Sequence, residues 1–132
     1  REGHPTTPLL VVSPILCPIH ETTPGPSAPD YSQIAEGRLG FLATGDAADP
    51  TRLTLTTIRA ELDRIVGERA PADPHLHHLD GRELYGEADA VDLPLPDQLH
   101  PDAATHRLMG ERFAALAFAS GAPLDTARVI GT

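Results

Sequence analysis

The sequence is 132 residues long, enough for one domain with a hydrophobic core of its own. It carries a formal net charge of −9 and has no lysine. This argues against binding to nucleic acid or to an anionic membrane surface, because both require a basic patch. No apolar run reaches the roughly 18 residues of a membrane-spanning helix. The single cysteine, Cys17, excludes an internal disulfide framework and a cysteine-rich metal site.

The first predicted element is a strand in the segment TPLLVVSPILCP. Its core, LLVV at residues 9–12, is uninterrupted and bracketed by Pro8 and Pro14, which leave no room for a helix. Such a run is typical of a strand buried on both faces, and these strands belong mainly to parallel sheets. Residues 19–37 are rich in Pro, Gly, Ser and Thr, so we expect a long loop there, a type of segment that often carries function.

A helix is predicted within residues 49–70, where apolar residues recur at helical spacing. Thr51 or Thr54 suits its N-cap, and Gly67 and Pro71 suit its end. Arg59 is expected to lie off the apolar stripe. The stripe consists of Leu55, Ile58, Leu62 and Ile65.

A second strand is predicted in DPHLHHLDGRELYG. Alternation places His75, His77 and Leu79 on one face, and Asp80-Gly81 then turns the chain.

The segment that follows, up to Pro101, is predicted to be a connection punctuated by prolines. A final helix is predicted between Asp102, in its first turn, and Gly121, at its end. Its expected apolar stripe is Ala104, Leu108, Phe113 and Leu116.

The order strand, loop, helix, strand, loop, helix predicts a βαβα unit with both strands parallel in one sheet. Two buried parallel strands do not make a sheet whose faces and edges are all covered. We therefore expect either self-association or pairing with an N-terminal part that is not in this chain. The opening REGHPTTP has no Met, so we expect the natural start to lie further upstream.

The segment DQLHP, residues 97–101, offers the clearest chemistry. A histidine can act as a general base near neutral pH, and a carboxylate on its other ring nitrogen fixes the tautomer. Asp97 and His100 are three residues apart at a turn, so the carboxylate can fold back on the imidazole, and Pro101 at the first helical position would make that turn rigid. The alternative is that Asp97 merely caps the helix and His100 is an ordinary surface residue.

The sequence LPDQLHPDAATHRLMGERFA resembles the last sequence block of the SGNH, or GDSL-type, hydrolases. The fourth strand of that family and the loop after it are similar to HPTTPLLVVSPILCPIHETTPGP. The next helix and the fifth strand of the family are similar to IRAELDRIVGERAPADPHLHHLDGRELYG. The resemblance implies a flavodoxin-like α/β/α sandwich with a parallel sheet, of which residues 1–132 form the C-terminal part. It also implies a serine ester hydrolase, esterase- or lipase-like and without a cofactor, in which Asp97 orients and His100 is the base.

The other blocks of that family, G-D-S, a glycine block and G-x-N-D, are not found in this sequence. The resemblance therefore implies that the nucleophile and oxyanion donors lie elsewhere, and that this chain alone has little or no activity. Ser13, which follows the first strand, is a weak substitute nucleophile because Pro14 removes the next backbone N–H. A packing or hydrogen-bonding role near the site, with contact to the substrate, suits Ser13 better.

Further candidates for binding are Cys17, His20, and the pair His75 and His77. Cys17 and His20 lie in or beside the loop after the first strand, where they would line a substrate pocket; solvated or buried positions without a function are the alternative. A Cys17–His100 dyad is possible in principle. His75 and His77 would suit a transition metal, but no third ligand stands at convincing spacing, so no metal is expected.

The sequence thus predicts an esterase part that supplies Asp97 and His100 and acts on an ester substrate. The alternative is a non-catalytic α/β module that binds a partner through its proline-rich loop. The two differ in whether His100 is needed for function.

Overall fold

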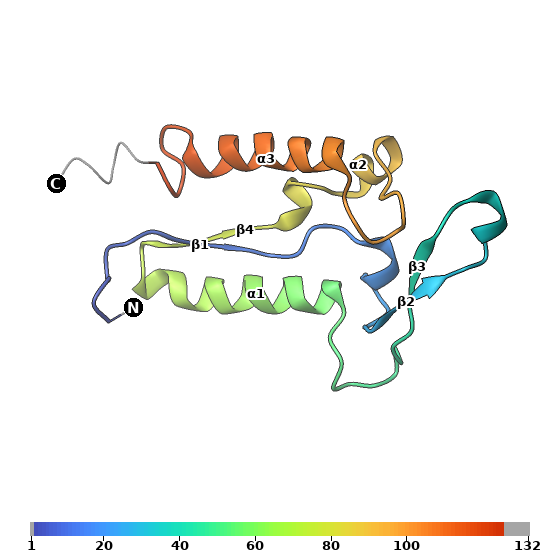
Figure 1. Ribbon diagram of the computed structural model, residues 1–132. Coiled ribbons are helices and arrows are strands. Elements are labelled where there is room, and N and C mark those ends of the chain that lie inside the picture. Colours follow the sequence, from blue (N-terminus) through green and yellow to red (C-terminus); the bar gives the residue numbers. More distant parts are fainter. Residues whose placement is uncertain (1, 126–132) are drawn as a thin grey trace.

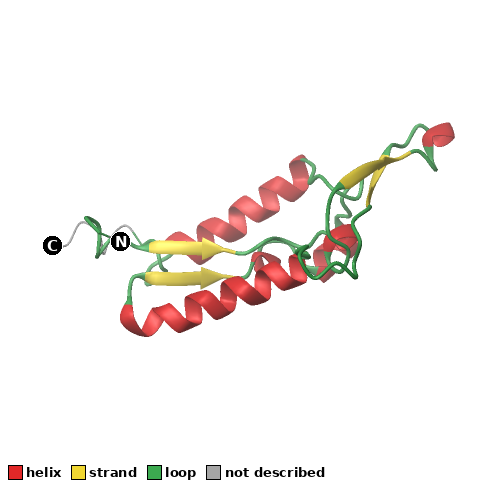
Figure 2. Cartoon of the chain, turned by 90° about the horizontal axis from the view of Figure 1, so that it is seen from below, coloured by secondary structure: helices red, strands yellow, loops and turns green. Residues whose placement is uncertain are grey.

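The fold is mixed α/β and is built on a two-stranded parallel sheet (Figures 1 and 2). The computed structural model describes residues 2–125. Strand β1 (Leu9–Val12) pairs with β4 (Leu76–Leu79), from Leu9 opposite Leu76 to Val12 opposite Leu79. Both predicted strands and their parallel direction are confirmed.

The two long helices flank this sheet in Figure 1, α1 (Leu55–Arg69) on one side and α3 (Ala103–Phe118) on the other. Thr54 caps α1 by accepting a hydrogen bond from the Thr57 N–H, and Asp102 caps α3 by accepting one from the Thr105 N–H at 2.8 Å. A two-stranded hairpin and a short helix, described below, were not predicted.

An antiparallel hairpin begins within residues 19–37, which corrects the prediction of a loop over that whole segment. Strand β2 (Ser27–Asp30) pairs with β3 (Gly40–Ala43), and the hairpin projects beyond the carboxyl ends of β1 and β4 (Figure 1). The sequence of β2, SAPD, has little strand propensity and includes a proline. Its conformation therefore depends on pairing with β3 rather than on a local pattern.

The last part of the chain also differs from the prediction. The expected connection contains a short helix, α2 (Glu87–Asp92). Pro101 precedes the N-cap of α3 instead of occupying its first helical position. The residues that α3 buries are Thr105 and Ala117, whereas Leu116 of the predicted stripe is 38% exposed. The alanine-rich sequence of α3 gives a weak periodic signal, and contacts with its neighbours decide which face is buried.

Strand β1 is not buried on both faces, contrary to the prediction. Leu9 is 44% exposed and Val12 is 39% exposed. The two strands and two long helices therefore leave apolar surface that this chain does not cover.

The main buried cluster lies just beyond the carboxyl ends of the two parallel strands. It consists of Leu16 and Cys17, which follow β1, with Tyr85 and Leu95 from the segment after β4. The Tyr85 side chain is fully buried, and its hydroxyl donates a hydrogen bond to the Leu93 carbonyl at 2.8 Å. This cluster supports the turn that carries Asp97 and His100.

None of the helices in residues 2–125 is long and apolar enough to cross a bilayer.

Candidate active site

Asp97 and His100 form a hydrogen-bonded pair in the turn that leads into α3. Asp97 Oδ2 lies 2.7 Å from His100 Nδ1. The other carboxylate oxygen, Oδ1, accepts hydrogen bonds from the backbone N–H groups of Leu99 at 3.0 Å and of His100 at 2.7 Å. Asp102, not Asp97, caps the helix, so helix capping does not explain why Asp97 is present.

The electrostatics of the pair suit a base and its orienting acid. Burial by itself would raise the pKa of the Asp97 carboxyl, but hydrogen bonds from His100 and from the Leu99 N–H together lower it to about 2. The carboxylate is therefore ionised near neutral pH and accepts a hydrogen bond from the N–H at His100 Nδ1. In the neutral ring Nε2 then carries the lone pair. The imidazole is 65% exposed, and within the described residues Nε2 makes no hydrogen bond.

Long-range contacts hold this turn in shape. Gln98 has a φ of 69°, in the left-handed region that a residue with a side chain rarely adopts. The Gln98 N–H donates a hydrogen bond to the Leu95 carbonyl at 3.0 Å. The Gln98 carbonyl accepts a hydrogen bond from the Cys17 thiol at 3.7 Å. These contacts hold Gln98 in a strained conformation, which places the Asp97 carboxylate over the backbone N–H groups that follow it.

The hairpin contacts the same turn through Gly40 and Phe41. The Phe41 N–H donates to the Asp97 carbonyl at 2.9 Å, and the Phe41 ring packs edge-on against the His100 ring, with centroids 5.5 Å apart. A Cβ at Gly40 would lie 3.1 Å from Nε2 of Gln98, so glycine suits this close approach. Phe41 therefore contacts both ends of the Asp97–His100 turn from an element far away in the sequence.

Ser13 does not hydrogen-bond to the pair. It is 3% exposed, and its hydroxyl accepts a hydrogen bond from the Gly81 N–H at 3.0 Å. A Cβ at Gly81 would collide with the Ser13 carbonyl oxygen, so the two segments that follow β1 and β4 meet closely here. In this structure Ser13 holds those segments together beneath the surface.

Cys17 lies next to the turn, since its thiol contacts the Gln98 carbonyl, but it is 8% exposed. Burial raises the pKa of the Cys17 thiol, with the nearby charges of Glu21 and Asp97 acting in the same direction. The neutral thiol is a poor nucleophile, so this environment disfavours a Cys17–His100 dyad.

His20 hydrogen-bonds to groups other than the Asp97–His100 pair. It ends the short 3-10 turn Pro18–His20, its Nδ1 lies 3.2 Å from the Thr23 carbonyl, and its Nε2 lies 2.9 Å from the Ser27 hydroxyl.

An ion pair beside the turn anchors the loop after β1. Arg59, only 6% exposed, pairs with Glu21 and donates to the Pro14 carbonyl at 3.2 Å. Glu21 in turn accepts from the Cys17 N–H at 3.1 Å. Arg59 was predicted to lie off the apolar stripe of its helix, yet the structure buries it together with Val66. It is buried because its guanidinium satisfies carbonyls that the loop would otherwise leave without partners.

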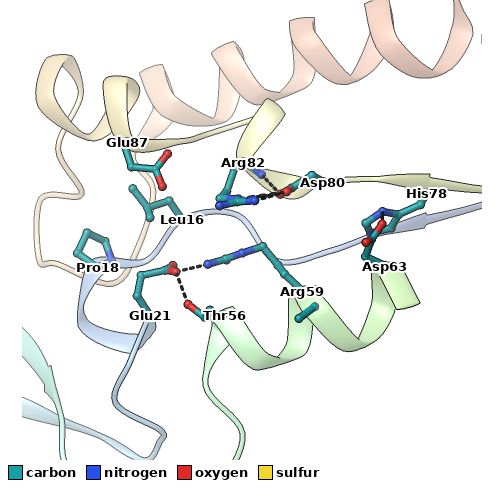
Figure 3. Close-up of a pocket in the computed structure, with 11 residues that line it drawn as sticks. Leu16, Pro18, Glu21, Thr56, Arg59, Asp63, His78, Asp80, Arg82 and Glu87 are labelled. Atoms are coloured by element: carbon teal, nitrogen blue, oxygen red, sulfur yellow. Dashed lines mark hydrogen bonds and ion pairs between the residues drawn. The ribbon is translucent and has the colours of Figure 1, made fainter. Parts of the chain in front are cut away.

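This ion pair lines a cavity of about 830 Å³ next to α1 (Figure 3). On the opposite wall Arg82 pairs with Asp80, and the nearest atoms are 2.6 Å apart. Neither Asp97 nor His100 lines this cavity. It is therefore a neighbouring feature and not the space around the His100 base.

His75 and His77 line a second cavity, of about 740 Å³, near the amino ends of the strands. In residues 2–125 no group of three or more potential ligands gathers around a common point.

Four features of the site were not predicted from the sequence: the contacts of Phe41, Gly40 and Gln98, and the burial of Arg59. Of these, only Gly40 gave a local signal, as a glycine inside an apolar run; the others depend on contacts between distant segments.

No family model, no curated protein and no solved structure matches this chain. The resemblance to SGNH hydrolases therefore rests on the residues of the chain, above all on Asp97 and His100.

Proposed function

We propose that this chain supplies the acid and base of a carboxylic ester hydrolase of the SGNH type. The observation that carries the proposal is the 2.7 Å hydrogen bond between an ionised Asp97 and Nδ1 of an exposed His100. His100 takes a proton from a serine hydroxyl through Nε2 and returns it to the leaving alcohol, while Asp97 orients the ring and stabilises the imidazolium. In this proposal the complete domain has a flavodoxin-like α/β/α sandwich fold.

The serine in this proposal comes from another segment. The chain has four serines, and in the described structure none of them bonds to His100. The backbone of β1 suggests where such a segment attaches. The N–H groups of Leu9 and Ser13 donate to β4, so those of Leu10 and Val12, at alternate positions, face the opposite edge. A further strand that pairs with this edge would cover the exposed apolar residues of β1 and carry the nucleophile toward His100.

The test is hydrolysis of a short-chain nitrophenyl ester with and without a segment that bears a G-D-S block. We expect no turnover dependent on His100 from this chain alone, and turnover once the segment is added. In the complemented protein His100→Ala should lower kcat by roughly 10³-fold or more. His106→Ala, which changes an exposed histidine on α3, is the matched control and should have no effect. Complemented turnover that survives His100→Ala would contradict the proposal.

A second candidate function, docking of a protein partner on the hairpin, is favoured by one observation. The hairpin and its connection expose large apolar side chains, namely Tyr31, Ile34, Leu39 and Leu42. A non-catalytic module of this kind predicts that His100→Ala leaves function unchanged, whereas a Tyr31→Ser and Ile34→Ser double variant abolishes binding. The proposed esterase predicts the opposite result for His100→Ala.

A further inference from the structure

A serine–histidine pair lies outside the proposed site, where the 3-10 turn Pro18–His20 meets the first residue of β2. His20 Nε2 is 2.9 Å from the Ser27 hydroxyl, and His20 Nδ1 is 3.2 Å from the Thr23 carbonyl oxygen. A carbonyl oxygen only accepts, so in the neutral ring Nδ1 carries the proton and donates it to Thr23. Nε2 is then the acceptor for the Ser27 hydroxyl. The ring is thus held in the tautomer that a general base requires.

The backbone around Ser27 is fixed from the far side of the hairpin. The Pro26 carbonyl accepts hydrogen bonds from both the N–H and the hydroxyl of Thr44, each at 2.9 Å. The Gly25 carbonyl accepts from Arg52 Nη1 at 3.0 Å. Ser27 itself pairs with Ala43 in the hairpin. The serine is therefore positioned by its backbone and does not depend on His20 to hold it.

The turn that carries His20 is anchored separately. Glu21, the next residue, pairs with the buried Arg59 and accepts from the Cys17 N–H. The base and the hydroxyl are thus held by two independent sets of contacts, and Ser27 is exposed to solvent. A nucleophile requires a base held in place and an oxygen that substrate can reach, and this arrangement provides both. A hydrogen bond with only a structural role requires neither.

We propose that Ser27 is a second nucleophile, activated by His20, which accepts acyl groups from activated esters. The Ser27 oxygen attacks the acyl carbon and its proton passes to His20 Nε2. The bond from the acyl carbon to the leaving oxygen then breaks, the leaving group departs as the alcohol or phenol with that proton, and an acyl ester remains on Ser27. The Thr23 carbonyl bears only a partial charge in place of a carboxylate, so the reaction is slower than with a full triad.

The experiment uses this chain alone with nitrophenyl acetate as the probe, followed by intact mass and peptide mapping. We expect one stable acetyl group on Ser27, formed roughly 100-fold faster than on Ser32, an exposed serine that no histidine contacts in the described structure. Ser27→Ala should abolish the label. His20→Ala should slow it by a similar factor, and added imidazole should restore part of the rate, which a purely structural histidine would not allow.

Circular dichroism of each variant checks that the fold is retained, and His106→Ala serves as the control histidine. The proposal is overturned if Ser27 reacts no faster than Ser32, if His20→Ala leaves the Ser27 rate unchanged, or if the label persists in Ser27→Ala. Because the readout is Ser27 in the chain alone, these results are independent of whether Asp97 and His100 serve an ester hydrolase.

Discussion

At the scale of single residues, the candidate site depends on one short turn. The Asp97 carboxylate accepts three hydrogen bonds, two from backbone N–H groups and one from the His100 ring. All three favour the charged carboxylate, and they outweigh the burial that opposes it. The same contacts that prepare His100 as a base therefore also stabilise the folded chain in a manner that depends on pH.

The first prediction concerns Asp97→Asn. The pKa of Asp97 is lowered to about 2 in the folded state, against about 3.9 when unfolded. Its contribution to stability is thus present above about pH 4 and is lost as the pH falls through about 2. We expect Asp97→Asn to lower the unfolding free energy by about 1–2 kcal/mol at pH 6 and by much less near pH 2. Urea unfolding at both pH values measures this, with exposed Asp92→Asn as control; an equal loss at both would contradict it.

The second prediction concerns Phe41→Ala, which removes the ring against His100 but keeps the backbone hydrogen bond to Asp97. Loss of an edge-on aromatic pair should lower the unfolding free energy by about 0.5–1.5 kcal/mol beyond the loss of buried area. The proton resonances of the His100 ring should also shift as the ring current disappears. Leu42→Ala changes the neighbouring exposed residue and should leave those resonances in place. Unshifted His100 resonances in Phe41→Ala would show that the rings are not in contact.

At the scale of elements, the loop after β1 is anchored to a helix in addition to its own internal hydrogen bonds. Arg59 of α1 reaches the carbonyls of Pro14 and Ile15 and pairs with Glu21, whose side chain is 19% exposed. Both partners are largely removed from water, so each is stabilised mainly by the other. The same helix also carries Arg64, whose pairs with Glu61 and Glu68 are exposed.

The third prediction compares these two arginines. Arg59→Ala leaves Glu21 buried without its partner and should lower the unfolding free energy by about 3 kcal/mol or more. Arg64→Ala removes only exposed ion pairs and should lower it by less than about 1 kcal/mol. Urea denaturation of both variants, monitored by circular dichroism, gives the comparison. Equal effects would mean that Arg59 is not the anchor of the loop.

At the scale of the whole molecule, the described structure leaves apolar side chains of β1 exposed, namely Leu9 and Val12. The parallel sheet has two strands among the described residues, and the outer edge of β1 presents unused backbone groups at Leu10 and Val12. This surface supports the expectation that the sheet continues into another segment or another copy of the chain.

The fourth prediction tests that edge with two proline variants. Val12→Pro removes an N–H that faces away from β4, so the helix content of the chain should be retained while self-association and binding of a G-D-S segment are lost. Val11→Pro removes an N–H that faces β4 and should destabilise the chain by about 3 kcal/mol. Sedimentation and circular dichroism distinguish the two. Association that is unaffected by Val12→Pro would exclude the edge of β1 as the binding surface.

The sequence by itself determined the features that depend on near neighbours. The strands at residues 9–12 and 76–79, a threonine cap at the start of α1, and the spacing of Asp97 and His100 can be derived from the pattern, because the groups that interact lie within a few residues of each other. The sequence left Thr51 and Thr54 as alternatives for that cap, and it placed Asp102 in the first turn of α3 rather than at its N-cap. Their physics is local: hydrophobic alternation, helix capping and a turn that brings a carboxylate back to an imidazole.

Only the tertiary structure decided what meets across long stretches of chain. The hairpin forms and places Phe41 on His100, Arg59 is buried by Glu21, and Ser27 reaches His20. In each case the two partners come from different elements. The local sequence around one partner does not predict the identity of the other. The prediction that β1 is buried on both faces was wrong for the same reason. An apolar run indicates a strand that is stabilised by burial, but it does not show which segment of the protein packs on that strand.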